Sequence, residues 1–371
     1  MSEFEAIRPY QDHEVPQVVA RVMKSPALVA AATELLLPGW LAGNPFGRWL
    51  AFWLLRYRAR NLVSIRDVQA LISKYLELLV ERSITALSVS GFSGLDPNRT
   101  YLFVSNHRDI VLDSGLLNYI LHREGHDTCR MAVGDNLLGN SLVGDLMRLN
   151  KSFVVERSVS GKRAQYRTLA RTSAYIRQSL AAGVSVWIAQ RPGRAKDGFD
   201  RTDTAVLKML LLAYRGEEQA LSKLLKTPIV PVAVSYEVDP CGPLKAKELC
   251  AVATHGQYQK SPEEDIHSMV KGVTEYKGRV HLTFGRPISS AEDAGSLAAE
   301  IDQAIVGGLR IFPTHRYARA VKEHVQGELD GTDDAVTALQ RQLDACELEE
   351  RPYLLDQYAN IWRNRDELGI E

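Results

Sequence analysis

The chain has 371 residues and a mass of 41.3 kDa, enough for one large domain with additions or for two ordinary domains. Hydrophobic residues make up 45% of it and charged residues 24%, which excludes a wholly disordered protein. Lys and Arg balance Asp and Glu at 45 each, so no net charge favours nucleic acid or another polyanion. Any basic surface must therefore be local.

Cysteine usage and the first residues favour a cytoplasmic protein. The four cysteines lie far apart and form no CxxC pair, which indicates reduced thiols rather than a zinc site or a disulfide framework. We therefore expect no bound metal. The N-terminal segment, MSEFEAIRPYQDHE, is polar and acidic and lacks the basic and apolar regions of a signal peptide.

Residues 1–90 are expected to be helical, and they include a segment rich in tryptophan and arginine. No acid occurs between Glu34 and Asp67, a stretch that holds three of the five tryptophans. Its apolar runs, residues 27–37 and 48–57, are shorter than the ~18–20 residues that a membrane span requires. Short helices with Trp and flanking Arg suit a membrane interface, and a helix pair buried against the core is the alternative.

From about residue 98, short β-branched runs alternate with helical ones. Strands are predicted at residues 101–105, 130–133, 153–155, 184–189, 229–236 and 279–284. Helices are predicted at residues 114–123, 140–149, 162–182 and 204–212. The alternation is typical of an α/β fold with a largely parallel central sheet flanked by helices. We expect an N-terminal helical, membrane-facing region at 1–94, the α/β domain at 95–290 and a C-terminal helical extension at 291–371.

Polar clusters follow three of the predicted strands, at residues 105–113, 156–158 and 190–198. In an open α/β sheet, ligands bind beyond the carboxyl ends of the strands. Three such clusters can converge on one crevice, so we expect the functional site there.

The first cluster supplies a candidate general base. His107 has two nearby carboxylates, Asp109 and Asp113, and a carboxylate bonded to Nδ1 would leave Nε2 free to take a proton from a hydroxyl. The chain has no GxSxG, GxGxxG or P-loop motif, so the attacking hydroxyl is expected to belong to the substrate. This arrangement favours attack of a substrate alcohol on an activated acyl group.

The other two clusters supply positive charge. Candidate phosphate-binding residues in these loops are Arg157, Arg191, Arg194 and Lys196, and ordinary surface side chains are the alternative. Gly193 permits close approach of the backbone, and Asn106 opens the first cluster. We assign Asn106 and Gly193 to the loops that meet the acceptor.

At these residues the sequence resembles the glycerophospholipid acyltransferase family, which includes glycerol-3-phosphate and 1-acylglycerol-3-phosphate acyltransferases. Four blocks occur in the family's order: NHRDIVLD at 106–113, FVVERS at 153–158, WIAQRPGR at 187–194 and IVPVAVSY at 229–236. VHLTFGRPI at 280–288 looks like the family's closing strand. The resemblance covers about residues 95–290 and implies that His107 is catalytic and that Arg157 binds phosphate.

The sequence departs from the family pattern at two places. The family places four residues between its His and Asp, whereas five separate His107 from Asp113 and one separates it from Asp109. We favour Asp113 as the residue that orients His107, with Asp109 as the rival. Pro192 stands where the family usually carries Glu, which removes a carboxylate and a backbone donor.

The resemblance implies an O-acyltransferase of phospholipid synthesis. Its donor would be acyl-CoA or the acyl carrier protein thioester acyl-ACP, and its acceptor a glycerol-phosphate lipid precursor, preferably 1-acylglycerol-3-phosphate, with no cofactor. Together with residues 40–60, it implies peripheral contact with the inner face of the membrane and no nucleic acid partner. Two alternatives stay open: a lipid- or acyl-CoA-binding protein that has lost catalysis, and an acyltransferase with a non-phosphate acceptor.

Overall fold

The computed structural model describes residues 3–42, 44–139, 141–261, 263–324 and 333–370. The chain divides into two compact units, each built from two stretches of sequence. The first unit comprises Met1–Tyr75 and Arg130–Thr172, and the second comprises Leu76–Cys129 and Ser173–Glu371. Within the described residues, none of the helices combines the length and the apolar character that crossing a membrane requires.

The first unit is mainly helical. Its helices are α1 (Val15–Val22), α2 (Pro26–Leu36), α3 (Gly39–Ala42), α4 (Pro45–Ala59), α7 (Ser141–Leu149) and the first parts of α5 (Ile65–Ser83) and α8 (Lys162–Ala181). Strands β3 (Arg130–Gly134) and β4 (Ser152–Val155) pair in parallel. The valines of α1, spaced three to four residues apart, pack on Ala59, Ile65, Val68 and Leu149 in one core cluster.

The second unit contains the sheet that carries the candidate site. Its strands are β1 (Ile84–Ser90), β2 (Leu102–Ser105), β5 (Val186–Ala189), β6 (Ile229–Tyr236) and β7 (Gly278–Phe284), in the order β1-β7-β6-β2-β5. Only the β6–β7 pair is antiparallel among these neighbours. β2 and β6 are buried along their whole length, as continuous apolar runs in a parallel sheet should be.

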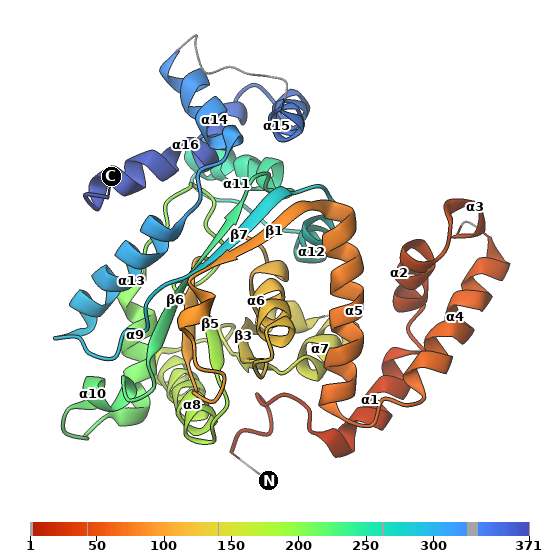
Figure 1. The fold of residues 1–371 in the computed structure, drawn as a ribbon, viewed down its shortest axis with the longest axis horizontal. Helices are drawn as coiled ribbons and strands as arrows, with labels where there is room; N and C mark the ends of the chain where they lie inside the picture. The colour runs from red at the N-terminus through yellow and green to blue at the C-terminus, as the bar shows by residue number, and fades with distance from the viewer. Residues whose placement is uncertain (1–2, 43, 140, 262, 325–332, 371) are drawn as a thin grey trace. The chain divides into compact units, whose positions relative to one another are not determined.

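Helices cover this sheet on both faces (Figure 1), with α9 (Thr204–Leu211) and α13 (Ala294–Gly308) on one side and α6 (Leu112–Arg123) and α12 (Glu264–Thr274) on the other. The remaining helices are α10 (Ala220–Leu224), α11 (Gly242–His255), α14 (Pro313–Glu323), α15 (Asp334–Ala345) and α16 (Arg351–Glu367). Apolar residues of α11 and α14–α16 form a second core cluster, so the C-terminal helices are packed elements of this unit.

The predicted α/β fold with a largely parallel sheet is confirmed, and each of the six predicted strands is present. The expectation of helix throughout residues 1–90 is wrong at 84–90, which form β1 and pair in parallel with β7. The segment ITALSVS alternates small polar and apolar residues because only one face of this edge strand is covered. The division into regions 1–94, 95–290 and 291–371 stays a prediction.

Candidate functional site

Three neighbouring parallel strands, β6, β2 and β5, bring their carboxyl ends together. β2 pairs with β5 from Leu102↔Val186 to Ser105↔Ala189, and with β6 on its other edge. The loops that follow β2 and β5 therefore start side by side, at the position where α/β sheets bind ligands. This pairing brings the first and third polar clusters of the sequence together.

His107, in the loop that connects β2 to α6, forms a hydrogen bond with Asp113 in the first turn of α6. His107 Nδ1 lies 2.8 Å from Asp113 Oδ2. Asp113 Oδ2 also accepts the backbone N–H groups of Arg108, at 2.6 Å, and Asp109, at 2.9 Å. Because α6 begins only at Leu112, His107 lies on non-helical backbone and can reach a residue six positions later.

Asp109 has a different role from Asp113. Its Oδ1 accepts the backbone N–H groups of Val111 and Leu112, both at 2.8 Å, and so stabilises the turn into α6. Burial, together with the neighbouring charge of Asp113, raises the pKa of the Asp109 carboxyl. Of the two rival carboxylates, Asp113 is therefore the one that contacts His107.

Tyr236, the last residue of β6, is a member of the site that the sequence analysis did not single out. Its buried hydroxyl donates to Asp113 Oδ1 at 2.8 Å. Burial and the nearby Asp113 carboxylate raise the pKa of Tyr236 well above its ordinary value, so the hydroxyl stays a donor. Its place at the end of the fourth sequence block, on the strand beside β2, is the signal that could have identified it.

The loop after β5 is fixed to the His107 loop through the backbone. Gln190 N–H donates to the carbonyl of Ser105 at 2.8 Å, and Ala195 N–H donates to the carbonyl of His107 at 2.7 Å. Trp187 contributes a side-chain contact, because its ring meets the His107 ring edge-on with 5.9 Å between centroids. These contacts fix the position of the loop with the basic residues, 191–196, relative to His107.

These basic residues line an open depression of about 550 Å³ together with Pro192 and Gly193. Arg194 has one guanidinium nitrogen, Nη1, that is buried without a hydrogen-bond partner, and its Nη2 lies 3.4 Å from Ser268 Oγ. Lys196 is already paired with Glu248, and Arg191 lies 3.9 Å from Asp197. Arg194 therefore has the clearest free capacity to bind an anion.

Asn106 and Gly193 shape the two loops. The Asn106 amide donates to the carbonyl of Val234 at 3.0 Å and accepts from its N–H at 2.8 Å, which ties the His107 loop to β6. Gly193 has a φ of +80°, and no atom lies within 4 Å of the place a Cβ would take. Glycine is required there by the backbone conformation and not by crowding.

Arg157 belongs to the first unit, where it directly follows β4. Its side chain is exposed, and no ion pair holds it among the residues that the structure describes. The N–H of the next residue, Ser158, donates to Asp135 Oδ2 at 3.0 Å and fixes the turn. Binding of the acceptor phosphate by Arg157 stays a prediction.

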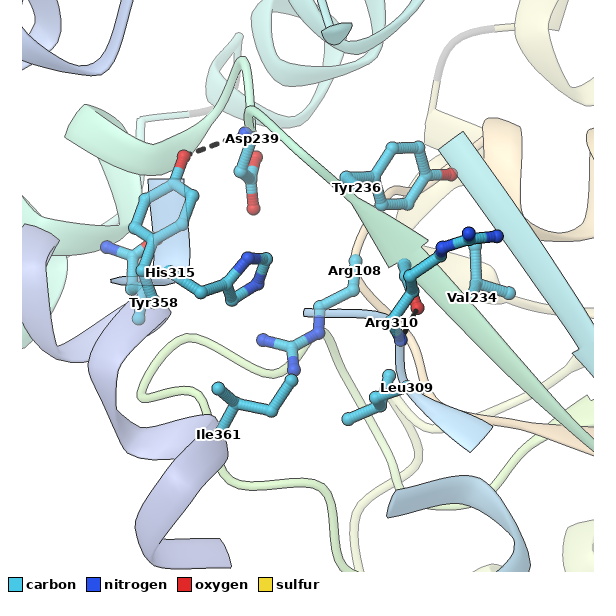
Figure 2. Close-up of a pocket in the computed structure, with 11 residues that line it drawn as sticks. Arg108, Val234, Tyr236, Asp239, Leu309, Arg310, His315, Tyr358 and Ile361 are labelled. Carbon is cyan, nitrogen blue, oxygen red and sulfur yellow. Dashed lines mark hydrogen bonds between the residues drawn. The ribbon is translucent and has the colours of Figure 1, made fainter. Parts of the chain in front are cut away.

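Arg108 points into a small polar cavity of about 30 Å³ (Figure 2). Its guanidinium pairs with the fully buried Asp200 and extends toward His315 and Ile361, as Figure 2 shows. Burial alone would lower the pKa of Arg108, but the Asp200 and Asp239 carboxylates outweigh it and raise the pKa. The ion pair thus links the loop that carries His107 to Asp200, which follows the basic residues 191–196.

Helix α16 supports the same segment from the other side. Asn360 Nδ2 donates to the carbonyl of Asp197 at 2.7 Å. A Cβ on Gly198 would lie 2.8 Å from the backbone oxygens of Asp356 and Gln357, so only glycine lets the loop approach α16 this closely. The C-terminal extension therefore helps to build the site.

The second unit thus presents a His–Asp pair and an arginine-bearing loop at the carboxyl end of a parallel sheet. Residues 86–235 match the family model described as Acyltransferase. In the part of the chain described here, no three His, Cys, Asp or Glu side chains are grouped as metal ligands would be.

Curated proteins that are similar in sequence to this chain are also named as acyltransferases. Dihydroxyacetone phosphate acyltransferases of Bos taurus and Homo sapiens are each 24% identical over 194 residues, covering 51% of this chain and 26% of theirs. Glycerol-3-phosphate acyltransferase of Pseudomonas fluorescens (strain SBW25) is 23% identical over 230 residues, covering 62% of this chain and 26% of its own. The chain thus spans about a quarter of the length of these relatives.

Among solved structures, the 1-acyl-sn-glycerophosphate (LPA) acyltransferase PlsC from Thermotoga maritima is 15% identical, with a TM-score of 0.38. That match covers 75% of this chain and 92% of that one. The match of residues 86–235 to the Acyltransferase family model and the names of these relatives confirm the predicted resemblance to the glycerophospholipid acyltransferases.

Replacing Tyr236 by Phe should lower kcat for acyl transfer about tenfold or more with KM little changed, because a hydrogen bond to a charged group contributes roughly 1.5–3 kcal/mol. The matched control is Tyr101→Phe, which removes a tyrosine hydroxyl that accepts the N–H of Asp96 at 2.9 Å, just before β2 and at the opposite end of that strand from His107. Steady-state kinetics and urea unfolding of both variants make the measurement. Equal kinetic loss in both variants would contradict a positioning role for Tyr236.

Proposed function

We propose that this protein transfers a fatty acyl group from a thioester donor, acyl-CoA or acyl-ACP, to a hydroxyl of a glycerol-phosphate lipid precursor. The observation that carries the proposal is the buried Asp113 carboxylate on His107 Nδ1, beside a loop that holds an unpaired Arg194 nitrogen. The relatives' names add that their acceptors are glycerol-3-phosphate and dihydroxyacetone phosphate.

In the proposed reaction, His107 Nε2 takes the proton of the acceptor hydroxyl as its oxygen attacks the thioester carbonyl carbon. The tetrahedral intermediate then expels the sulfur of the donor, and the imidazolium returns the proton to the thiolate. Asp113 holds the ring in the tautomer with Nδ1 protonated and stabilises the imidazolium when it forms. The reaction forms an ester and a free thiol and requires no cofactor.

Arg194 is proposed to bind the acceptor phosphate, because it lines the depression and its guanidinium has a nitrogen without a hydrogen-bond partner. Arg191, on the same depression, is proposed to support it. Phosphate binding by Arg157, which belongs to the first unit, is proposed separately, from the resemblance alone. Lys196 would contribute less direct attraction because Glu248 already neutralises it. We propose 1-acylglycerol-3-phosphate as the preferred acceptor.

Pro192 favours a second candidate function, a lipid-binding protein that has lost catalysis. It lines the depression at the position where the family usually carries Glu, and proline offers neither a carboxylate nor an N–H. A non-phosphate acceptor is less well supported, since Arg191 and Arg194 line the same depression.

The test is release of free thiol from a long-chain acyl-CoA, with glycerol-3-phosphate, dihydroxyacetone phosphate, 1-acylglycerol-3-phosphate or no acceptor. We expect release that depends on an acceptor and that falls about a hundredfold or more in a folded His107→Ala variant, because the general base is lost. Acceptor-independent release, or full activity in His107→Ala, would contradict the mechanism. No release with any acceptor, restored by Pro192→Glu, would favour the lipid-binding alternative.

Contact with a membrane is proposed through α3 and α4. Trp40, Trp49 and Trp53 are 78%, 56% and 49% exposed, which supports this proposal over the alternative of a helix pair buried against the core. The buried face of α4 consists instead of Gly47, Ala51, Leu55 and Ala59. Exposed Trp beside Arg48, Arg56, Arg58 and Arg60 suits the interface of an anionic bilayer, and we propose that this is the cytoplasmic face.

The membrane proposal predicts that Trp40→Ser, Trp49→Ser and Trp53→Ser together weaken binding to anionic phospholipid vesicles about tenfold or more, because the interfacial aromatic rings are lost. Cosedimentation measures the effect, and Leu348→Ser, at a residue 75% exposed in the second unit, is the control. Deleting residues 1–60 is unsuitable, since Val15, Val18, Val19 and Val22 belong to the core. Unchanged cosedimentation of the triple variant would contradict the proposal.

A further inference from the structure

A second buried charge contacts the loop that leads to Asp113. Lys245, on α11, is 2% exposed and belongs to the second unit, beyond residue 235, where the match to the family model ends. A lysine is almost never fully buried unless an acid pairs with it, and Asp239 does so here. A buried ion pair is weak evidence for stability, because the cost of removing two charges from water offsets much of their attraction. The other contact of Lys245 therefore indicates the role of this charge.

Lys245 binds a peptide group of the loop that carries His107. Its ammonium donates to the carbonyl of Arg108 at 2.7 Å. The N–H of the same peptide group is that of Asp109, and it donates to Asp113 Oδ2 at 2.9 Å. One peptide group therefore lies between a buried cation and a buried anion. Its dipole, about 3.5 D, has the carbonyl end on the ammonium and the N–H end on the carboxylate, so both charges favour the observed orientation.

The orientation of this peptide group matters because the group lies outside helix and strand, in a loop that ends at Leu112, where α6 begins. If the peptide group turned over, its carbonyl oxygen would face the carboxylate of Asp113 and its N–H would face the ammonium of Lys245, which is repulsive at both ends. Asp113 Oδ2 would also lose a donor, and this oxygen is the atom that lies 2.8 Å from His107 Nδ1. The contact made by Lys245 is therefore linked to the hydrogen bond that holds the histidine.

Lys245 is itself held in place by the elements around it. Its partner Asp239 follows β6, and Oδ1 of Asp239 accepts the N–H of Cys241 at 2.8 Å. The N–H of Asp239 donates to the hydroxyl of Tyr358, on α16, at 2.8 Å. The position of the ammonium is thus fixed by α11, by the turn after β6 and by α16. The loop peptide adopts the orientation that this fixed charge favours.

We propose that Lys245 is a positioning residue for His107. Its ammonium keeps the peptide group between Arg108 and Asp109 turned so that the N–H stays on Asp113. The carboxylate of Asp113 in turn fixes the ring of His107 with its proton on Nδ1. The inference rests on the proposed function, in which His107 presents an unprotonated Nε2 to the acceptor. Lys245 acts through the peptide group and not by contact with the substrate.

The test is Lys245→Met, which removes the ammonium and keeps an unbranched side chain in its place. In the folded variant we expect kcat for acyl transfer to fall about tenfold or more, with the KM values of donor and acceptor changed less than about twofold, because only the alignment of the base is lost. Nitrogen-15 NMR of His107 should show the neutral fraction that is protonated on Nε2 rising about threefold or more over the wild type.

A second variant guards against misfolding caused by an unpaired buried carboxylate. It combines Lys245→Met with Asp239→Asn, which removes both charges of the pair and keeps the oxygen that accepts the N–H of Cys241. We expect the same fall in kcat and the same change of tautomer in this variant, because the peptide group again lacks the ammonium.

The matched control is Lys277→Met. Lys277 is also fully buried in the second unit, but its ammonium donates to Ser83 Oγ and to backbone carbonyls at the C-terminal end of α12. We expect Lys277→Met to lower stability to urea and to leave kcat within about twofold of the wild type.

An unchanged tautomer of His107 in the folded variants of Lys245 would overturn the proposal, whatever their activity. An equal loss of kcat in Lys277→Met would overturn it too, since loss of any buried lysine would then explain the effect. If the wild-type protein transfers no acyl group, the proposed function fails separately. The NMR comparison of wild type and variants then still decides whether Lys245 positions His107.

Discussion

The carboxylate of Asp113 is fully buried, and a carboxylate in that position is stable only when donors surround it. Four donors do so: His107 Nδ1, the N–H groups of Arg108 and Asp109, and the hydroxyl of Tyr236. They come from the loop after β2 and from the end of β6, so they meet only when these strands are paired. The same hydrogen bonds that stabilise the Asp113 carboxylate also set the orientation of His107. The proposed catalysis by His107 therefore depends on the pairing of β2 with β6.

The second constraint comes from outside the part of the chain that matches the family. That match ends at residue 235, yet the loop beside His107 is supported by α16, whose Asn360 binds the carbonyl of Asp197 and whose backbone packs on Gly198. The buried Arg108–Asp200 pair fastens the two loops to each other. The C-terminal helices thus stabilise the loop after β5. The side chain of Asn360 donates a hydrogen bond to a backbone carbonyl of this loop, which belongs to no helix or strand.

Much of this arrangement could be predicted from the sequence, because buried parallel strands are continuous apolar runs and the polar residues that end them lie at one edge of the sheet. β1 was missed because its short alternating segment has low apolar content. Asp113 could be favoured but not chosen over Asp109, because their spacing from His107 fits no helix and only the loop geometry decides. Tyr236 was missed because it ends an apolar strand, and its contact with Asp113 joins residues 123 positions apart. The ion pair between Lys196 and Glu248 on α11 also could not be predicted from the sequence, because only the folded chain brings these two residues together.

The central claim is that Asp113 fixes the tautomer of His107. The most direct measurement is nitrogen-15 NMR of the histidine side chains near neutral pH, with the His107 signals assigned by comparison with His107→Gln. We predict that neutral His107 carries its proton on Nδ1, facing Asp113, and leaves Nε2 unprotonated and able to accept a proton. A neutral His107 with its proton on Nε2 would contradict the account, since the base would then have no free nitrogen facing the acceptor.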